Sequence, residues 1–479
     1  MFDFSFVNAG IGDYILLFFK LYFFVLGLIA ISYTIYLIPK FTYRLIKKPD
    51  IKSIFLILFL ILFSIFNITR NILIITSFFV LVLYSVNFII SSYSAILLKI
   101  KEKSDKTKKP MNSDTKNFSS TDYDYPVISI LFPLKNESKI ICNSIDKVFE
   151  IDYPLDKINI VVIDDHSTDN TLEVLNSYSK KEKITILEND QEPGKASSLN
   201  KALQYINTEF VLILDADHYM SKDFLKKGIQ FFNDKDVALV QGMNTIRNGK
   251  RSLISKLVEI EYNGLQQVFY YTRNAALFLG SGGLFRCESL RSTGNFNNDI
   301  PTEDWEMSYR LHQKGYKIIF CNKISTFELA PEKIKDFLKQ RYRWMRGTWT
   351  GVKVQFSNII KSTNIENSKR FEILSLAFVP IILFGNFLLF FFYSFSCIKI
   401  ISFPIDLKII LLFHIPFYIF NILGLIFAKN IKSLPFILFI PYQYLLYSLS
   451  DFEAMIDEWV FNNKFKGLKA DRSSINLVE

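Results

Sequence analysis

Residues 52–98 constrain the fold of this chain more than any other segment, because they are almost entirely apolar. A single helix of that length would reach roughly 70 Å, more than twice the thickness of a hydrocarbon core. The segment must therefore turn, and residues 67–71 provide a polar break. We expect the preceding apolar run at 14–38 to be an anchor and not a cleaved signal peptide. The pattern thus predicts three transmembrane helices within residues 1–98.

Basic residues beside these runs predict the orientation of the helices. The break between the second and third runs has only Arg70. Five basic residues lie between the first two runs (Lys40, Arg44, Lys47, Lys48 and Lys52), and six follow the third (Lys99, Lys101, Lys103, Lys106, Lys108 and Lys109). Because cytoplasmic loops carry the excess of Lys and Arg, we expect the amino terminus outside and the chain after the third helix in the cytosol. Attraction to anionic headgroups explains the net charge of +10, and we expect no nucleic-acid partner.

A more polar region follows. The mean hydropathy of +0.21 lies between the values of a soluble enzyme and of an all-membrane chain, which indicates two kinds of segment. Residues 99–124 are rich in Lys, Ser, Thr and Asp, which predicts a flexible basic linker. Between 125 and 330, short apolar runs at 127–134, 158–164 and 210–217 alternate with helical patterns. This alternation predicts an α/β domain with a largely parallel sheet.

The remainder of the chain returns to the membrane. Residues 331–370 are basic and amphipathic, which predicts interfacial helices along the membrane surface. Residues 371–450 predict two or three transmembrane helices, since two prolines interrupt the last of three apolar stretches (371–397, 407–428 and 433–450). Basic residues in the tail at 451–479 favour the cytosol, but four acidic residues at its start leave its side open.

Cysteine and histidine follow no metal-binding pattern. The four cysteines are far apart and form no C-x-x-C pair. The four histidines, among them His166 and His218, show no ligand spacing. We therefore expect neither disulfides nor a structural zinc site.

The second predicted strand ends in a pair of carboxylates, Asp164 and Asp165. Residues 167–169 could simply cap a helix at 171–180. Capping does not explain two carboxylates fixed at a strand end, where α/β proteins bind their ligands. We therefore favour a ligand role for Asp165.

A second carboxylate pair, Asp215 and Asp217, ends the apolar run at 210–217. Two carboxylates one residue apart at a sheet edge repel each other and need a cation. Mg²⁺ or Mn²⁺, with diphosphate oxygens completing its shell, is the common solution. The pair therefore predicts a divalent metal site.

Later segments carry further candidates, each with two readings. Glu303 and Asp304 are either acidic residues favoured at a helix amino terminus or the location of a general base. Gln340, Arg343 and Trp344 share one helix face through their spacing. They either anchor an interfacial helix or bind a leaving diphosphate and a sugar ring. The glycine-rich segment 280–283 is either a tight turn or a close approach of substrate to the backbone.

In this order, the motifs resemble those of the inverting family 2 glycosyltransferases with a GT-A fold. The membrane-embedded synthases of cellulose, chitin, hyaluronan and poly-N-acetylglucosamine are the nearest likeness. The resemblance covers about residues 125–350 and rests on DDHS at 164–167, DAD at 215–217, TED at 302–304 and QRYRW at 340–344. It implies a Rossmann-like GT-A catalytic domain in the cytosol, inserted between the transmembrane helices of a multi-pass protein of the cell membrane.

The resemblance also implies roles for individual residues. Asp217 would bind the Mg²⁺ or Mn²⁺ ion, and Asp304 would deprotonate the acceptor hydroxyl. Trp344 and Glu303 would bind a carbohydrate or lipid-linked acceptor. The donor, a UDP-sugar, would be held by Glu137, Asp165, Lys195, Asp215, Gln340 and Arg343. Transfer would be one direct displacement at the anomeric carbon, with inversion.

Three functions follow from these features. We rank processive polysaccharide synthesis first and single sugar transfer to a membrane lipid or lipid-linked glycan second. The chain has fewer carboxyl-terminal spans than cellulose synthases usually carry, which weighs against a long secreted polymer. A non-catalytic scaffold or transporter is third, because every carboxylate that the chemistry requires is present. A transporter would place charges within its spans, where only Lys20 lies well inside one.

Overall fold

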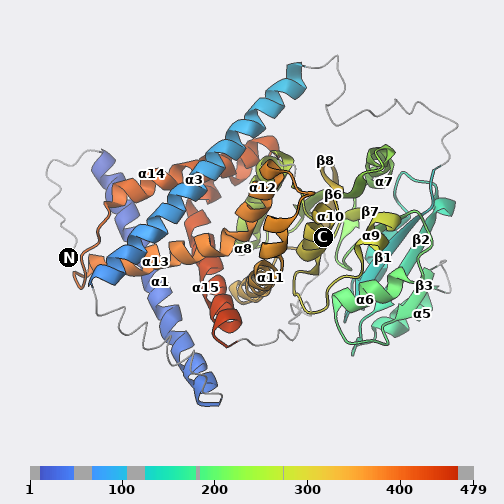
Figure 1. The fold of residues 1–479 in the computed structure, drawn as a ribbon, viewed down its shortest axis with the longest axis horizontal. Helices are drawn as coiled ribbons and strands as arrows, with labels where there is room; N and C mark the ends of the chain where they lie inside the picture. Colours follow the sequence, from blue (N-terminus) through green and yellow to red (C-terminus); the bar gives the residue numbers. More distant parts are fainter. Residues whose placement is uncertain (1–10, 48–66, 105–124, 180–183, 273–274, 462–479) are drawn as a thin grey trace.

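A mixed sheet occupies one half of the molecule and long apolar helices occupy the other (Figure 1). The computed structural model describes residues 11–47, 67–104, 125–179, 184–272 and 275–461. The second predicted transmembrane helix, the linker from residue 105 and the tail from residue 462 lie outside the described residues.

Eight strands form one sheet in the order β3-β2-β1-β4-β7-β6-β8-β5. The strands β3, β2, β1 and β4 are parallel, whereas β7 is antiparallel to both β4 and β6. The predicted parallel sheet is therefore confirmed for its first half, and the second half is mixed. The bounds are β1 (Ile128–Leu134), β2 (Ile158–Asp164), β3 (Ile184–Glu188), β4 (Phe210–Ile213), β5 (Tyr219–Met220), β6 (Val237–Ile246), β7 (Gly283–Arg286) and β8 (Lys317–Glu328).

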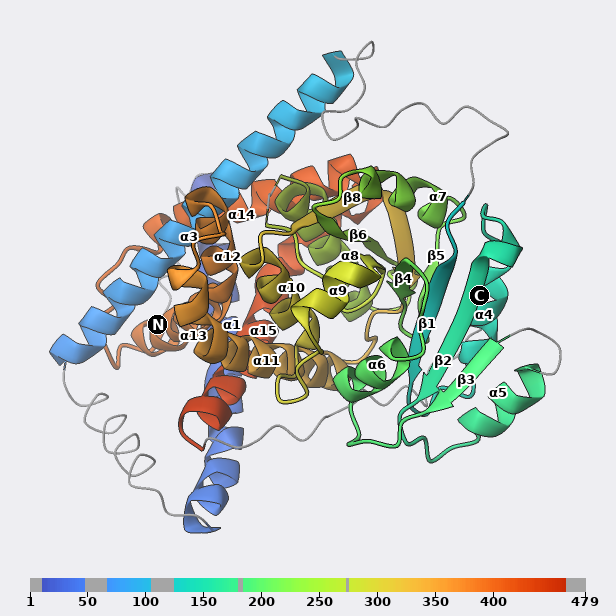
Figure 2. The same ribbon diagram turned by 45° about the vertical axis from the view of Figure 1, so that its right-hand side comes forward.

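Helices cover both faces of the sheet, which explains why the central strands are apolar without alternation. On β1, Ile130 and Phe132 belong to one buried cluster, while Leu131 between them belongs to the other. The first cluster packs under α4 (Ile141–Val148) and α7 (Phe224–Gly228). The second packs under α6 (Lys195–Leu203), α9 (Cys287–Thr293) and α10 (Glu303–Gln313) (Figure 2). Each such apolar side chain contributes roughly 1.5–3 kcal/mol when fully buried.

The remaining short elements of this half connect the strands. They are η1 (Leu155–Lys157), α5 (Thr171–Ser179), η2 (Ile229–Asn233), α8 (Leu253–Gly264), η3 (Leu265–Phe269) and η4 (Tyr270–Thr272).

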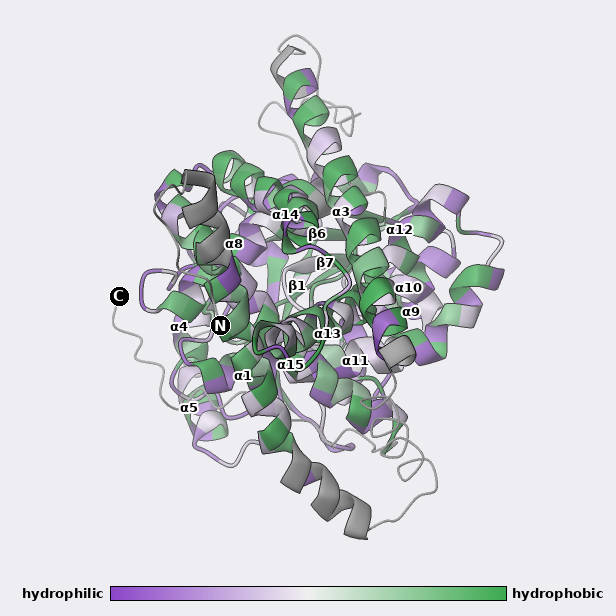
Figure 3. Ribbon diagram, turned by 90° about the vertical axis from the view of Figure 1, so that its left-hand side faces the viewer, coloured by the Kyte–Doolittle hydropathy of each residue, from purple (hydrophilic) through white to green (hydrophobic). Residues whose placement is uncertain are grey.

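Four helices among the described residues are long and apolar enough to cross a membrane. They are α1 (Ile11–Lys47), α3 (Asn67–Ser104), α13 (Val379–Cys397) and α14 (Leu407–Phe427). Figure 3 shows hydrophobic residues along most of α3 and α14. The helix α3 begins at Asn67, where the sequence predicted the polar break.

The structure divides the carboxyl-terminal stretches differently from their apolar runs. The basic stretch at 331–370 contains α11 (Ile334–Lys361) and the start of α12 (Asn367–Ala377). The run at 371–397 is broken before Pro380, at the start of α13, and the run at 433–450 is divided between η5 (Ile431–Phe439) and α15 (Ile440–Trp459). Both α13 and α15 have proline in their first turn, where a missing N–H costs nothing.

Candidate active site

The loops after β1, β2 and β4 and the loop before β7 meet at one edge of the sheet. Register sets this arrangement, because Leu134 at the end of β1 is paired with Asp164 at the end of β2, and Ile213 at the end of β4 is paired with Gly283. Carboxyl ends of parallel strands are the usual ligand site of such sheets.

Charged side chains from α6, from the loop after β4 and from α10 converge on Gly280. The Nζ atom of Lys195, in the first turn of α6, lies 2.5 Å from Oδ1 of Asp215 and 2.8 Å from the Gly280 carbonyl oxygen. A Cβ atom on Gly280 would lie 2.9 Å from Oδ2 of Asp304, so this carboxylate rests directly against the glycine. Gly280 has φ of +83°, a conformation that glycine adopts readily. Three of the predicted site residues are therefore neighbours.

Lys195 and Asp215 form an ion pair inside the site. Burial disfavours both charges, but attraction to Asp215 outweighs burial and raises the pKa of Lys195. Burial likewise opposes ionisation of Asp215, and Lys195 outweighs it to lower the pKa of that carboxyl. Lys195 thus already offsets the charge of Asp215, which reduces the repulsion expected between Asp215 and Asp217.

Asp217 is buried beside His218. Ring atom Nδ1 of His218 lies 3.2 Å from Oδ1 of Asp217, and Nε2 lies 3.5 Å from Oε2 of Glu328. Burial alone would lower the pKa of His218, but the two carboxylates raise it to about 10. Asp215, Asp217 and His218 each offer a ligand atom within 4.8 Å of the others. The histidine spacing along the chain gave no sign of this arrangement, because the neighbours of His218 are carboxylates and not other histidines.

Asp304 lies in the first turn of α10 and is half-buried. Burial, followed by the neighbouring Glu303 carboxylate, raises the pKa of Asp304 to about 7, although Lys195 and Arg343 oppose the rise. The capping position of α10 is Thr302, whose side chain makes no capping hydrogen bond. A carboxyl that titrates near neutrality suits proton abstraction at cellular pH.

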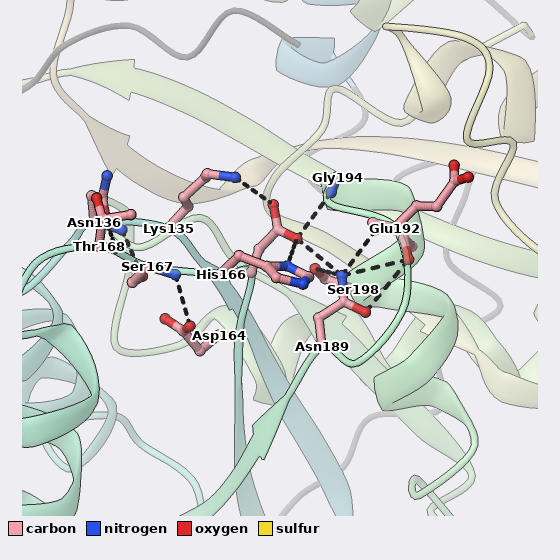
Figure 4. A network of polar contacts seen from close by, with 12 residues as sticks. Lys135, Asn136, Asp164, His166, Ser167, Thr168, Asn189, Glu192, Gly194 and Ser198 are labelled. Carbon is pink, nitrogen blue, oxygen red and sulfur yellow. Dashed lines mark hydrogen bonds and ion pairs between the residues drawn. The ribbon is translucent and has the colours of Figure 1, made fainter. Parts of the chain in front are cut away.

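Asp165 is the centre of a separate network, and Figure 4 shows its partners Lys135, Asn189 and Gly194. Its Oδ1 accepts hydrogen bonds from the Gly194 N–H and from the Asn189 side chain, both at 2.9 Å. Its Oδ2 lies 3.5 Å from Nζ of Lys135. Burial would raise the pKa of Asp165, but these donors outweigh it and lower the pKa. Asp165 therefore ties the loops after β1 and β3 to the residue before Lys195.

The capping interpretation of the segment after β2 applies to Asp169. Asp169 serves the start of α5, because its Oδ1 accepts the Thr171 N–H at 3.0 Å. The Thr171 hydroxyl in turn accepts the N–H of Glu137 at 2.9 Å, and the Glu137 side chain is buried. Asp164 accepts the Ser167 N–H at 2.9 Å.

The helix α11 carries Gln340, Arg343 and Trp344. It packs closely against the start of α10, because a Cβ atom on Gly347 would overlap the side chain of Thr302. This contact places Arg343 near enough for its charge to lower the pKa of Asp304.

One side of the Trp344 ring is in contact with Arg341. The guanidinium of Arg341 lies 4.2 Å from the centroid of the Trp344 ring, at the distance of a cation–π contact. Arg341 is fully buried, and its Nη2 lies 2.7 Å from Oε2 of Glu261 on α8.

Residues 126–347 match the family described as glycosyltransferase like family 2. This segment is a family 2 glycosyltransferase domain. A poly-beta-1,6-N-acetyl-D-glucosamine synthase of Staphylococcus epidermidis is 30% identical over 250 residues, which are 50% of this chain and 58% of that protein. The synthase of the same name from Staphylococcus aureus strain COL is 29% identical over 260 residues, 53% of this chain and 61% of that protein. The chain thus spans about three fifths of the length of these curated relatives.

A solved mannosyltransferase from Pyrobaculum calidifontis, in complex with GDP-Man and Mn²⁺, has a similar fold. It superposes with a TM-score of 0.52 at 19% identity, over 79% of this chain and 99% of its own. Its likeness confirms the predicted GT-A fold of the family 2 domain.

Two buried polar residues of the family 2 domain shape the Gly280 loop, and one of them, Gln241, was not singled out in the sequence. The Gln241 side chain donates to the Ser281 carbonyl oxygen at 2.9 Å and accepts the Leu279 N–H at 3.0 Å. The Ser281 hydroxyl accepts the Asp215 N–H at 3.0 Å. A glutamine within the apolar run VALVQGM was a usable signal, since a buried polar side chain requires partners.

Proposed function

We propose that this protein is a membrane glycosyltransferase that lengthens a polysaccharide by adding N-acetylglucosamine, with inversion, from a UDP-sugar donor. The observation that carries the proposal is the convergence of Lys195, Asp215 and Asp304 on Gly280, beside the Arg343 face of α11. The names of the curated relatives support the sugar and the polymer. The motif resemblance supports the uridine nucleotide and inversion.

The chemistry assigned to this chain is one displacement at the anomeric carbon. Asp304 takes the proton of the attacking acceptor hydroxyl, for which its raised pKa leaves it basic enough. Lys195, Gln340 and Arg343 bind the diphosphate side of the donor and offset the negative charge that develops on it. Trp344 offers its ring to the acceptor sugar, with Glu303 beside the base, and Glu137 and Asp165 order the nucleotide side.

The carboxylates at the end of β4 fit a divalent cation. Asp217 would hold the Mg²⁺ or Mn²⁺ ion, with Asp215 close enough to share it. When bound, such an ion supplies positive charge to the departing diphosphate. The chain's own contribution is to keep Asp217 oriented, which His218 does between Asp217 and Glu328.

The catalytic half lies in the cytosol in this proposal. Lys99, near the carboxyl end of α3, lies 4.7 Å from the centroid of the Tyr271 ring of the catalytic half. Lys40, near the carboxyl end of α1, pairs with Glu453 of α15. The basic end of α3 therefore lies beside the catalytic half, as the positive-inside rule requires for a multi-pass protein with a cytosolic enzyme.

A donor screen with purified protein in detergent tests the proposal. We expect Mn²⁺- or Mg²⁺-dependent release of UDP from UDP-N-acetylglucosamine, exceeding release from UDP-glucose and GDP-mannose. A product ladder or smear on a gel supports chain elongation, whereas a single added sugar would replace it with transfer to a lipid. No release from any donor would refute the enzyme assignment.

A further inference from the structure

The helix α11 has two distinct faces. Gln340, Arg343, Trp344 and Gly347 share one face, which Arg343 and Gly347 direct toward α10. A second set is centred about a third of a turn away: Tyr342, Arg346, Trp349, Thr350 and Lys353. This second face packs along α15.

Acidic residues of α15 bind nearly every polar group on that second face. Glu458 lies 3.2 Å from Nη2 of Arg346 and accepts the Thr350 hydroxyl at 3.0 Å. Asp451 accepts the indole N–H of Trp349 at 3.0 Å, and Asp457 accepts the Tyr342 hydroxyl at 2.5 Å. Three of the four acidic residues that obscured the topology in the sequence are thus directed at one helix.

These contacts are buried, so each of them depends on both partners being in place. The side chains of Arg346 and Glu458 are only 2% and 8% exposed, and Asp451 is fully buried. Removing one partner of a buried pair leaves the other charge uncompensated, so the arrangement tolerates one register of α11 against α15.

The face of α11 that carries Gly347 is also fixed, so the helix cannot shift to compensate for a lost contact with α15. Gly347 lies against Thr302, and the Gln355 side chain donates to Glu306 of α10 at 2.8 Å. Both residues of α10 flank Asp304, so the helix that carries Arg343 and Trp344 is held between α15 and the helix that carries the base.

We propose that Asp451, Asp457 and Glu458 of α15 are positioning residues for the transfer reaction, which fix Arg343 and Trp344 relative to Asp304. The inference rests on the proposed function and adds residues outside the family 2 domain to it. A displacement of about 1 Å in such a site can cost on the order of 100-fold in rate. Loss of one contact therefore affects binding and transfer at a site that the α15 residues do not touch.

The chain provides a matched control on the same helix. Glu453 is also acidic, but it binds Tyr33 at 2.9 Å and Lys40, both on α1. Glu458→Gln and Glu453→Gln therefore remove the same charge from α15, and only the first removes it from the α11 contact. Tyr342→Phe deletes a single hydroxyl of the contact and serves if Glu458→Gln fails to fold.

The experiment measures UDP affinity by calorimetry with Mn²⁺, the melting temperature, and the ratio of sugar transfer to donor hydrolysis. We expect Glu458→Gln and Tyr342→Phe to weaken UDP binding and to lower that ratio by roughly tenfold or more, while Glu453→Gln changes neither. The double variant Arg346→Gln/Glu458→Gln should bind UDP no more weakly than Glu458→Gln, because neither partner is then left charged.

Equal UDP affinity and equal transfer ratio in Glu458→Gln, Glu453→Gln and the unaltered chain would overturn the inference, even with a lowered melting temperature. A chain that binds UDP but turns over no donor would refute the proposed function instead. The affinity comparison would still decide the role of α15 in that case.

Discussion

Asp304 offers the sharpest test, because its raised pKa makes both activity and stability depend on pH. The carboxyl titrates at about 7 in the folded protein. A general base acts only when deprotonated, so kcat/KM should fall as the pH falls through 7. The ionised fraction changes from roughly 9% at pH 6 to roughly 91% at pH 8, so kcat/KM should rise about tenfold between these values.

Replacement of Asp304 by Asn distinguishes a catalytic base from a carboxyl group that serves only the structure. Asp304→Asn keeps the shape of the side chain and should lower turnover by roughly 100-fold or more, while UDP affinity changes little. Stability should move in the opposite direction. The folded pKa lies above the ordinary Asp value of 3.8, so protonation is favoured by folding, and stability is lost as the pH rises through 7. Asp304→Asn escapes that loss and should melt at a higher temperature than the unaltered protein at pH 8.

The assays are a pH profile of kcat/KM from 5.5 to 8.5, calorimetry with UDP, and melting at pH 6 and pH 8 in one detergent. Near-normal turnover of Asp304→Asn would refute the assignment, and Glu303 would then be tested as the base. A lowered melting temperature with unchanged turnover per folded molecule would show that Asp304 serves only the helix.

Three other substitutions probe the rest of the site. Asp217→Ala should abolish metal-stimulated transfer and the thermal shift that Mn²⁺ produces with UDP. The melting temperature without metal should be retained. Full turnover of the unaltered protein in excess chelator would contradict a metal role. Trp344→Ala should lower transfer while donor hydrolysis survives, because only acceptor stacking is lost; equal loss of both would point to a structural role. Gly280→Ala forces a Cβ atom against Asp304 at a φ of +83°. The substitution should lower turnover, and it should lower the free energy of unfolding by about 1–2 kcal/mol. A chemical denaturation curve that matches that of the unaltered chain would disprove the close approach.

The sequence predicted what depends on local pattern. Asp165 and Asp215 follow apolar runs, so their place at a strand end could be inferred from the runs themselves, and the GT-A fold followed from the order of the motifs. The contact of His218 with Glu328 could not be inferred, since 110 residues separate them and only the pairing of β5 with β8 brings them together. The binding of α15 to α11 escaped for a similar reason. A cluster of acidic residues reads as solvent-exposed until a partner helix is known.

The division of the carboxyl-terminal stretches was also beyond the pattern. Hydropathy measures how apolar a residue is and does not reflect the missing N–H of proline. The helix breaks at Pro380 and Pro441 are therefore hidden within longer apolar runs.

The ion pair between Lys195 and Asp215 makes ligand entry an exchange of partners. Asp215 is already neutralised before any ligand arrives, so a free divalent cation gains only part of the attraction that two bare carboxylates would offer. A cation that enters together with a diphosphate has no such disadvantage, because the phosphate oxygens can take over the ammonium group that Asp215 gives up. The site is thus built to select the metal–nucleotide complex over either component alone, and half-saturation by Mn²⁺ should fall as the donor concentration rises.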